Sequence, residues 1–355
     1  MESVWWNQIT NAANLIRDIR NHLLEEKSLV LYVPFDIPWK NRFDEIVMEK
    51  VARRESTRSF DVMEAPEENP GAFMLERYCD EDGRFEYRSN KTYAQFLAER
   101  TESDLNSHIV WVKNIPQHLM DEWIAFVSDY NTHLPPDAIP AVFLLETDAP
   151  VSVKARKGIE VISFDKAVSP FDAYTFCMLA ISTYRFKDRI KPYFAELVSD
   201  IGGIDVEFCA ACIQYGAQFL ENPAQVIQTV TDCHCRSTGK PFRYPSDPAE
   251  IDRLIWKAQI KTVFPVIEDY RMRFIAVYRS AIQDALPITN SYGETVETPE
   301  ETDIGVLYHL FKTGRFPTVS DRDKNRLSQV HKARNDLAHC KTLSFDEVES
   351  VLLET

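Results

Sequence analysis

The strongest constraint on the fold is a series of short apolar runs in the first 165 residues, separated by longer segments with helical periodicity. The runs are 28–34, 58–63, 108–112, 139–145 and 158–164, and the helical segments are 4–26, 41–53, 92–104 and 117–130. Strands that alternate with helices form parallel sheets, because each helix returns the chain to the start of the next strand. We therefore predict an α/β domain with a mostly parallel sheet of about four or five strands. Residues 64–90, rich in acid, proline and glycine, predict a long surface excursion, with a hairpin as one option.

Strand signals stop after residue 168, and the remaining chain has helical periodicity. A polar, turn-rich segment over 235–248 predicts a linker. Beyond it, a helix begins near Pro248, and the last long helix runs from Ser320 to about Leu337. We predict three domains: an α/β scaffold over 1–168, a helical domain with linker over 169–245, and an all-α bundle over 246–355.

Glycine positions exclude two nucleotide-binding motifs. None of the ten glycines is followed by another two residues later, so the G-x-G-x-x-G turn of dinucleotide-binding domains is absent. The Gly239-Lys240 pair is followed by Pro241, and His234 stands where a Walker A loop has its first glycine. Glycine-rich phosphate loops are therefore excluded.

The most informative motif is the sequence R-N-D-L-A-H, from Arg334 to His339. An arginine, a polar residue and a histidine after four intervening positions resemble the signature of HEPN-domain ribonucleases. In that family the motif lies toward the end of a helical bundle, which agrees with 246–355, and an acidic segment before a short helix, here 300–307, often precedes it. The resemblance implies a metal-independent endoribonuclease in prokaryotic antiphage or toxin-like defence, with Arg334 and His339 catalytic, Asn335 supporting, and no cofactor.

The residue types suit that chemistry. RNA cleavage without a metal needs a base for the 2′-hydroxyl, a cation for the phosphate and an acid for the leaving oxygen. Histidine titrates near neutrality, and the planar guanidinium of arginine matches a phosphate. On one straight helix, residues five apart are offset by about 140°, so Arg334 and His339 point in different directions. HEPN domains complete the site by dimerisation, so the resemblance implies a homodimer formed through the C-terminal bundle.

Local charge identifies candidate contacts to an RNA partner. Residues 251–355 contain 14 basic and 16 acidic side chains, whereas residues 1–250 contain 26 basic and 39 acidic ones. The small positive zone near the motif predicts four RNA-binding residues, which are Lys332, Arg326, Lys324 and Arg322. His309 and His331 are further candidates for the RNA cleft, although each also suits an ordinary surface or core position.

A second interpretation assigns the motif no chemistry. Lys332, Arg334 and His339 would stabilise the C-terminus of a helix through its dipole. The chain would then be a catalytically inactive HEPN-containing interaction subunit of a multi-protein defence complex.

The order of elements in the first half is similar to AAA-like and STAND-like P-loop ATPases. In that comparison, 30–33 is the first strand, 108–112 is the strand that normally ends in a Walker B acid, and 141–146 is the next. The turn 34–40 has neither glycine nor Lys-Ser/Thr, and Lys113-Asn114 replaces the carboxylate pair. The resemblance therefore implies a degenerate P-loop scaffold without hydrolysis that acts as a sensor, a regulatory unit or a dock for a protein partner. We expect Glu146 and Asp148 to be solvated acids and not metal ligands.

Composition sets the remaining limits. The net charge of −15 argues against a chain that coats nucleic acid or an anionic membrane over its whole surface. No apolar run reaches the roughly 20 residues of a membrane helix, and the N-terminus has no secretory signal pattern. Together with seven scattered cysteines, these features predict a cytoplasmic protein. Cys209, Cys212, Cys233, His234 and Cys235 have spacings compatible with zinc, but the first two also fit the apolar face of a buried helix.

Overall fold

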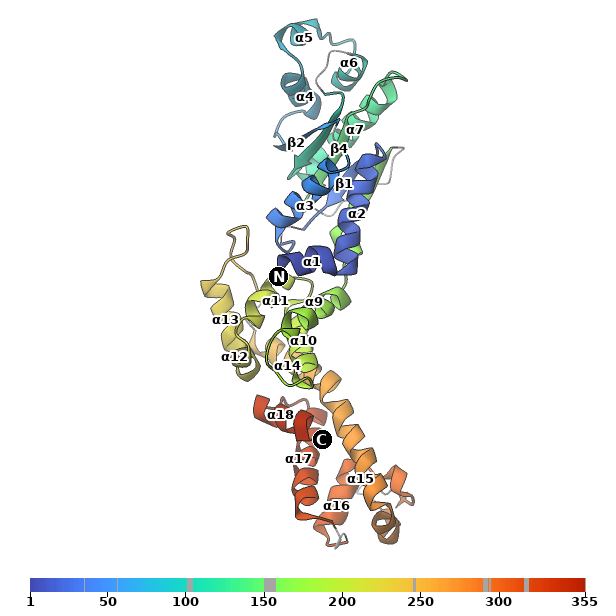
Figure 1. The fold of residues 1–355 in the computed structure, drawn as a ribbon, viewed down its shortest axis with the longest axis vertical. Coiled ribbons are helices and arrows are strands. Elements are labelled where there is room, and N and C mark those ends of the chain that lie inside the picture. Colours follow the sequence, from blue (N-terminus) through green and yellow to red (C-terminus); the bar gives the residue numbers. More distant parts are fainter. Residues whose placement is uncertain are drawn as a thin grey trace. The chain divides into compact units, whose positions relative to one another are not determined.

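The computed structural model describes residues 1–34, 36–55, 57–100, 105–149, 158–244, 247–289, 293, 295–315 and 319–354 (Figure 1). The chain forms two compact units. The first comprises Met1–Asp172 with Ser237–Gly239, and the second comprises Ala173–Arg236 with Lys240–Thr355. The predicted mixed α/β part followed by a helical part is confirmed, whereas the three domain boundaries stay a prediction.

The first unit is built on a five-stranded parallel sheet. The strands are β1 (Ser28–Tyr32), β2 (Ser59–Glu64), β3 (His108–Lys113), β4 (Val142–Thr147) and β5 (Ile159–Ser163). The helices are α1 (Glu2–Gln8), α2 (Thr10–Leu24), α3 (Lys40–Ala52), α4 (Pro70–Tyr78), α5 (Glu81–Glu86), α6 (Tyr93–Glu99), α7 (Gln117–His133) and α8 (Phe164–Ala167). Each predicted strand thus forms near its apolar run, and the parallel sheet is confirmed.

The excursion after β2 is helical, so the hairpin option for 64–90 is wrong. Asn69 accepts hydrogen bonds from the backbone N–H groups of Gly71 and Ala72 at the start of α4, where Pro70 occupies the first turn. Asp80 accepts one from Gly83 at the start of α5. These side chains satisfy backbone donors that a helix N-terminus leaves open, and proline costs nothing at that position.

In the strand order β2-β3-β4-β1-β5, the connections that leave β1 and β4 run toward opposite sides of the sheet. The chain leaves β1 for the distant edge strand β2 and returns through β3 and β4. It then crosses β1 to reach β5 on the other side. In open parallel sheets, ligand sites lie at the carboxyl ends of strands where such connections diverge. The carboxyl ends of β1 and β4 are therefore the position to examine for a site.

In its described residues the second unit is mostly helical (Figure 1), and it also contains a short antiparallel pair of strands. Its elements before the predicted linker are α9 (Pro170–Ser182, beginning in the first unit), α10 (Ile190–Gly202), α11 (Val206–Ile213), α12 (Ala217–Glu221) and α13 (Pro223–Cys233). Those after it are α14 (Pro248–Thr262), α15 (Phe264–Ala285), β6 (Ile288–Thr289), β7 (Thr295–Val296), η1 (Pro299–Glu301), α16 (Ile304–Lys312), α17 (Asp321–Ala338) and α18 (Phe345–Glu354). No helix in the described part of the chain combines the length and apolar character needed to cross a membrane.

One buried polar side chain joins the end of this unit to α14. Gln259 is fully buried, and its amide binds both backbone groups of Leu343: Nε2 donates to the carbonyl oxygen at 2.8 Å, and Oε1 accepts from the N–H at 2.8 Å. Both groups of Leu343 would otherwise be buried without water. This reciprocal pair therefore fixes the segment that connects α17 to α18.

We predict that Gln259→Leu lowers the free energy of unfolding by about 2–6 kcal/mol, because two buried backbone groups lose their partners at roughly 1–3 kcal/mol each. Urea unfolding followed by far-UV circular dichroism measures the change. A loss below about 1 kcal/mol would contradict the role assigned to Gln259.

Candidate functional site

The R-N-D-L-A-H motif forms the last turns of α17. Ser320 caps the start of this helix by accepting from the Asp323 N–H at 3.1 Å, and the helix ends at Ala338 with His339 as the C-terminal cap. Cys340 follows in the left-handed conformation (φ 57°), which lets Lys341 N–H reach the Asp336 carbonyl at 2.8 Å and Cys340 N–H reach that of Leu337 at 3.2 Å. This is a Schellman turn, which reverses the chain directly after a helix. It positions His339 at the point of reversal.

Helix α14 holds both sides of this turn. The indole Nε1 of Trp256 donates to the Leu337 carbonyl at 2.8 Å. The Gln259 amide binds Leu343 six residues further on. His339 lies between these two anchors and is exposed. The backbone around His339 is therefore fixed while its imidazole faces solvent.

Arg334 and Asn335 form a connected group with His331 of α17, Tyr308 of α16 and Asp303, the N-terminal cap of α16. Arg334 Nη1 donates to Asn335 Oδ1 at 3.2 Å, and Arg334 Nη2 lies 3.9 Å from a carboxylate oxygen of Asp303. Asn335 Nδ2 donates to His331 Nε2 at 3.0 Å. The His331 ring stacks on Tyr308 with centroids 4.0 Å apart and planes 9° apart. We call Asp303, Tyr308, His331, Arg334 and Asn335 the α16–α17 polar group.

The structure does not bring all three predicted catalytic side chains together. Asn335 is bonded to Arg334 and His331, so its suggested role in orienting His339 does not match its contacts. Within the described part of the chain, the His339 imidazole forms no hydrogen bond. This agrees with the expected angular offset between Arg334 and His339. The chain thus presents Arg334 and His339 as two parts of the motif that do not contact each other.

The electrostatic state of His331 follows from its neighbours. Burial lowers the pKa of His331 from its ordinary value, and the positive charge of Arg334 lowers it further, whereas Asp303 opposes the shift. A neutral ring accepts at Nε2 from the Asn335 amide, which leaves the proton on Nδ1. His331 is therefore neutral near pH 7 and oriented by two partners.

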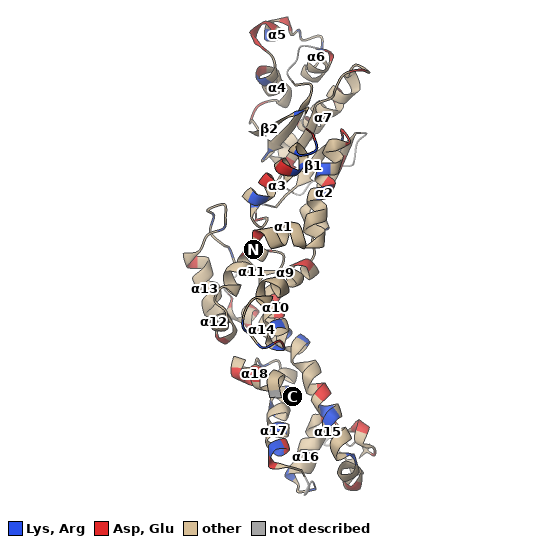
Figure 2. Ribbon diagram, viewed as in Figure 1, with Lys and Arg blue, Asp and Glu red and all other residues tan. Residues whose placement is uncertain are grey.

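The four predicted RNA-binding residues have different environments. Basic and acidic residues lie close together along the ribbon of α17 (Figure 2). Lys332 pairs with Glu347 at 2.6 Å, and Lys324 pairs with Asp321 at 3.1 Å, both on the surface. Exposed pairs of this kind contribute little and exchange readily with a phosphate. Arg322 is exposed, and no described residue forms a hydrogen bond or ion pair with it.

Arg326 is 7% exposed, which does not fit a surface contact to the RNA backbone. Its guanidinium donates to the Val351 carbonyl at 3.0 Å and to the Ser350 hydroxyl at 3.2 Å. These bonds join α17 to α18. We therefore reassign Arg326 as a structural residue whose side chain is oriented by the end of α18.

In the first unit, the carboxyl ends of β1, β3 and β4 are filled by charged side chains of the chain itself. Lys40 Nζ lies 2.5 Å from Asp44 Oδ1 and 3.0 Å from Glu146 Oε1, and Lys113 pairs with the other oxygen of Asp44. Trp111 Nε1 donates to Glu146 Oε2 at 2.9 Å. We call Lys40, Asp44, Trp111, Lys113 and Glu146 the sheet-edge cluster.

The expectation that Glu146 is a solvated acid is wrong. It is 3% exposed and bonded to Trp111 and Lys40, and burial raises its pKa. The position where a P-loop ATPase needs an acid carries Lys113, which pairs with Asp44. In the turn after β1, Pro34 and Pro38 have no backbone N–H that could donate to a phosphate. Phe35, in the same turn, lies outside the described residues. Among the described residues, the charged side chains at the carboxyl ends of these strands therefore pair with one another.

The cysteines of the alternative zinc set separate by environment. Cys209 and Cys212 are buried in α11, whereas Cys233 and Cys235 are exposed. The described residues contain no group of three or more side chains arranged to hold a metal ion.

Comparison with models of protein families finds none that matches this chain, and comparison with curated proteins finds no similar sequence.

Sequence reasoning gave Asp303 and Tyr308 no role in the site and named His331 only as a secondary candidate. The spacing of His331 and Asn335, four residues apart on a helix, was a readable signal that their side chains meet. The stacking partner Tyr308 comes from another helix and has no local signal.

We predict that Arg334→Gln raises the pKa of His331, because removal of the guanidinium charge eases protonation of the ring. Asp303→Asn should lower that pKa further, since the opposing negative charge is lost. Titration of the imidazole resonances by NMR measures both shifts, with His331→Asn used to assign the signal. An unchanged His331 pKa in both variants would show that the α16–α17 polar group is not coupled.

We predict that Lys40→Met destabilises the protein by about 3–5 kcal/mol, because it leaves the buried Glu146 carboxylate without its cation. Glu146→Gln should cost less, since the amide still accepts from Trp111. The double variant should recover part of the loss, which a double-mutant cycle from urea unfolding would quantify. Additive effects of the two substitutions would argue against the sheet-edge cluster as a coupled unit.

Proposed function

We propose that the helices after the linker act as a HEPN-type, metal-independent endoribonuclease, and that the first unit regulates it or docks a protein partner. The observation that supports the proposal most is the placement of the motif on α17. Arg334 is partly exposed in the last turns, and the exposed His339 caps the helix at a turn anchored on both sides by α14. Resemblance to HEPN proteins points to prokaryotic antiphage or toxin-like defence as the setting.

The chemistry assigns a role to each group. His339 takes the proton from a ribose 2′-hydroxyl, whose oxygen attacks the adjacent phosphorus. The bond from phosphorus to the 5′-oxygen breaks, and that oxygen receives a proton from a second acid. The products are a 2′,3′-cyclic phosphate and a 5′-hydroxyl. Arg334 stabilises the charge that builds on the phosphate oxygens.

Arg334 is available for this role because its present ion pair is weak. The distance of 3.9 Å to Asp303 and the exposure of both side chains, 34% and 57%, are typical of surface pairs worth about 0–1 kcal/mol. A phosphate that forms two parallel bonds with the guanidinium would replace the carboxylate. The Asn335 amide and neutral His331 then keep the Arg334 side chain near the last turns of α17.

A single copy offers one exposed motif histidine, whereas cleavage needs a base and an acid at the same time. A second copy of the chain supplies the missing group when two α17 ends face one cleft. The proposal therefore includes a homodimer formed through the helices after the linker.

The alternative function is an inactive interaction subunit, and one observation favours it. Arg334, Asn335 and His331 all have partners within the chain, as expected for a motif kept for structure. In that case the side chains of Arg334 and His339 can both be removed without loss of function in the assembled complex.

For the nuclease, we predict that His339→Ala and Arg334→Ala each lower the rate of RNA cleavage in EDTA at least about 100-fold, the usual range for loss of a proton-transfer group or a charge stabiliser. Both variants should keep the dimeric mass and the wild-type circular dichroism spectrum. The matched control is His118→Ala, which removes an exposed histidine from α7 of the first unit and should cleave within about twofold of wild type. Cleavage by His339→Ala at the wild-type rate would reject the nuclease and favour the interaction subunit.

A further inference from the structure

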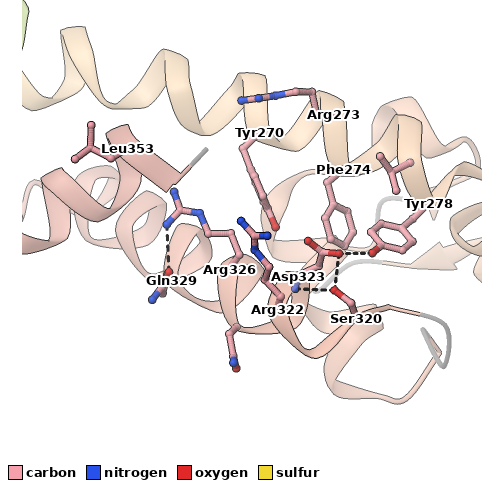
Figure 3. Close-up of a pocket in the computed structure, with 12 residues that line it drawn as sticks. Tyr270, Arg273, Phe274, Tyr278, Ser320, Arg322, Asp323, Arg326, Gln329 and Leu353 are labelled. Carbon is pink, nitrogen blue, oxygen red and sulfur yellow. Dashed lines mark hydrogen bonds between the residues drawn. The ribbon is translucent and has the colours of Figure 1, made fainter. Parts of the chain in front are cut away.

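A cavity of about 930 Å³ lies between α15 and α17, lined also by Leu353 of α18 (Figure 3). Its volume falls within the range of about 300–1,000 Å³ that small-molecule sites occupy. On α17 it is lined from the cap Ser320 to Gln329, whereas the motif begins at Arg334. The cavity is therefore separate from the proposed catalytic residues on the same helix.

One wall of the cavity is aromatic. Tyr270, Phe274 and Tyr278 follow one another at four-residue spacing on α15, which places them on one face of the helix. Their ring centroids are 5.9 Å and 4.7 Å apart in sequence order. Phe274 is 4% exposed and forms the apolar base, while the two tyrosines are partly exposed. The wall thus offers aromatic surface to a planar ligand.

The Tyr270 hydroxyl is a buried polar atom for which the described residues provide no hydrogen-bond partner. Figure 3 shows its side chain directed toward the arginines of α17. A buried hydroxyl without a partner costs about 1–3 kcal/mol. A ligand that accepts from this hydroxyl would remove that cost.

The facing wall carries positive charge. Arg322 and Arg326, four residues apart on α17, line the cavity, and Arg273 lines it from α15. Arg326 is held in place by the backbone of Val351. Asp323, the acid among the lining residues, is already bonded to Tyr278 at 2.5 Å and to Ser320 at 2.7 Å. Arg322 is exposed and forms no hydrogen bond or ion pair with a described residue, so its guanidinium is available to an incoming anion.

We propose that this cavity binds one nucleotide of a single-stranded RNA, with the base against Tyr270 and Tyr278 and the phosphate at Arg322. Aromatic rings that stack on bases, combined with guanidinium groups for the backbone, are how proteins hold single-stranded nucleic acid. The amide of Gln329 adds a donor and an acceptor for a base edge. The inference rests on the proposed ribonuclease in taking RNA as the ligand, and it adds a substrate-holding site distinct from Arg334 and His339.

The test measures binding separately from cleavage. In the full-length chain carrying His339→Ala, which keeps the RNA intact, fluorescence anisotropy reports binding of a labelled hexauridylate. Arg322→Gln should weaken binding at least about tenfold, the equivalent of one charged hydrogen bond. Arg253→Gln is the charge-matched control, an exposed arginine of α14 outside the cavity, and should change binding less than about twofold.

Tyr270→Phe gives a second, more specific readout. The variant keeps the ring and removes the buried hydroxyl, so it should raise the melting temperature of the free protein and at the same time weaken hexauridylate binding severalfold. A purely structural role would move stability and binding in the same direction. That result would overturn the role assigned to the hydroxyl.

Competition and mass measurements distinguish the remaining explanations. Uridine monophosphate should displace the labelled RNA at concentrations at which inorganic phosphate does not. Equal displacement by both would overturn base recognition and leave a simple anion site. Equal hexauridylate binding by Arg322→Gln and Arg253→Gln, or loss of the dimer in Arg322→Gln, would overturn the cavity as an RNA site. The binding assay does not require cleavage, so weaker RNA binding by Arg322→Gln would support the cavity as an RNA site even if the wild-type chain cleaves no RNA. Failure of this inference is therefore distinguishable from failure of the proposed nuclease.

Discussion

The bonds between the buried amide of Gln259 and the backbone of Leu343 are the interaction on which the C-terminal architecture depends. A chain that turns back immediately after a helix has backbone groups that must find partners inside the protein. Gln259 supplies them on the far side of the turn, and the Trp256 indole does so on the near side. Because both come from α14, the position of His339 is set by a neighbouring helix as well as by its own. The same two contacts determine where the Schellman turn at Cys340 lies.

The charged side chains discussed above are paired with one another in the first unit and exposed in the second. In the first, Lys40, Asp44, Lys113 and Glu146 neutralise one another at the edge of the sheet where parallel folds place their ligands. In the second, Arg322 and His339 lie exposed on one helix, beside an aromatic wall and at the C-terminal cap respectively. We therefore propose that the chemistry resides in the helices after the predicted linker and that regulation or docking resides in the first unit.

Patterns local in the sequence predicted much of this fold. Short apolar runs located the five strands, and Pro248 indicated where α14 begins. The helices α4 and α5 were missed although Asn69-Pro70 and Asp80 are ordinary helix starts, because composition outweighed these capping signals. The environments of Glu146 and Arg326 could not be predicted. Each depends on partners distant in the chain, Lys40 and Val351, that only tertiary packing brings close.

We propose that a 2′-hydroxyl attack, assisted by His339 and Arg334, cuts RNA. Mass spectrometry of the RNA ends left by the purified full-length chain in EDTA tests this mechanism. We expect 2′,3′-cyclic phosphate and 5′-hydroxyl ends, because the nucleophile belongs to the RNA itself. Ends with 3′-hydroxyl and 5′-phosphate groups, or RNA left intact by the dimer, would contradict it.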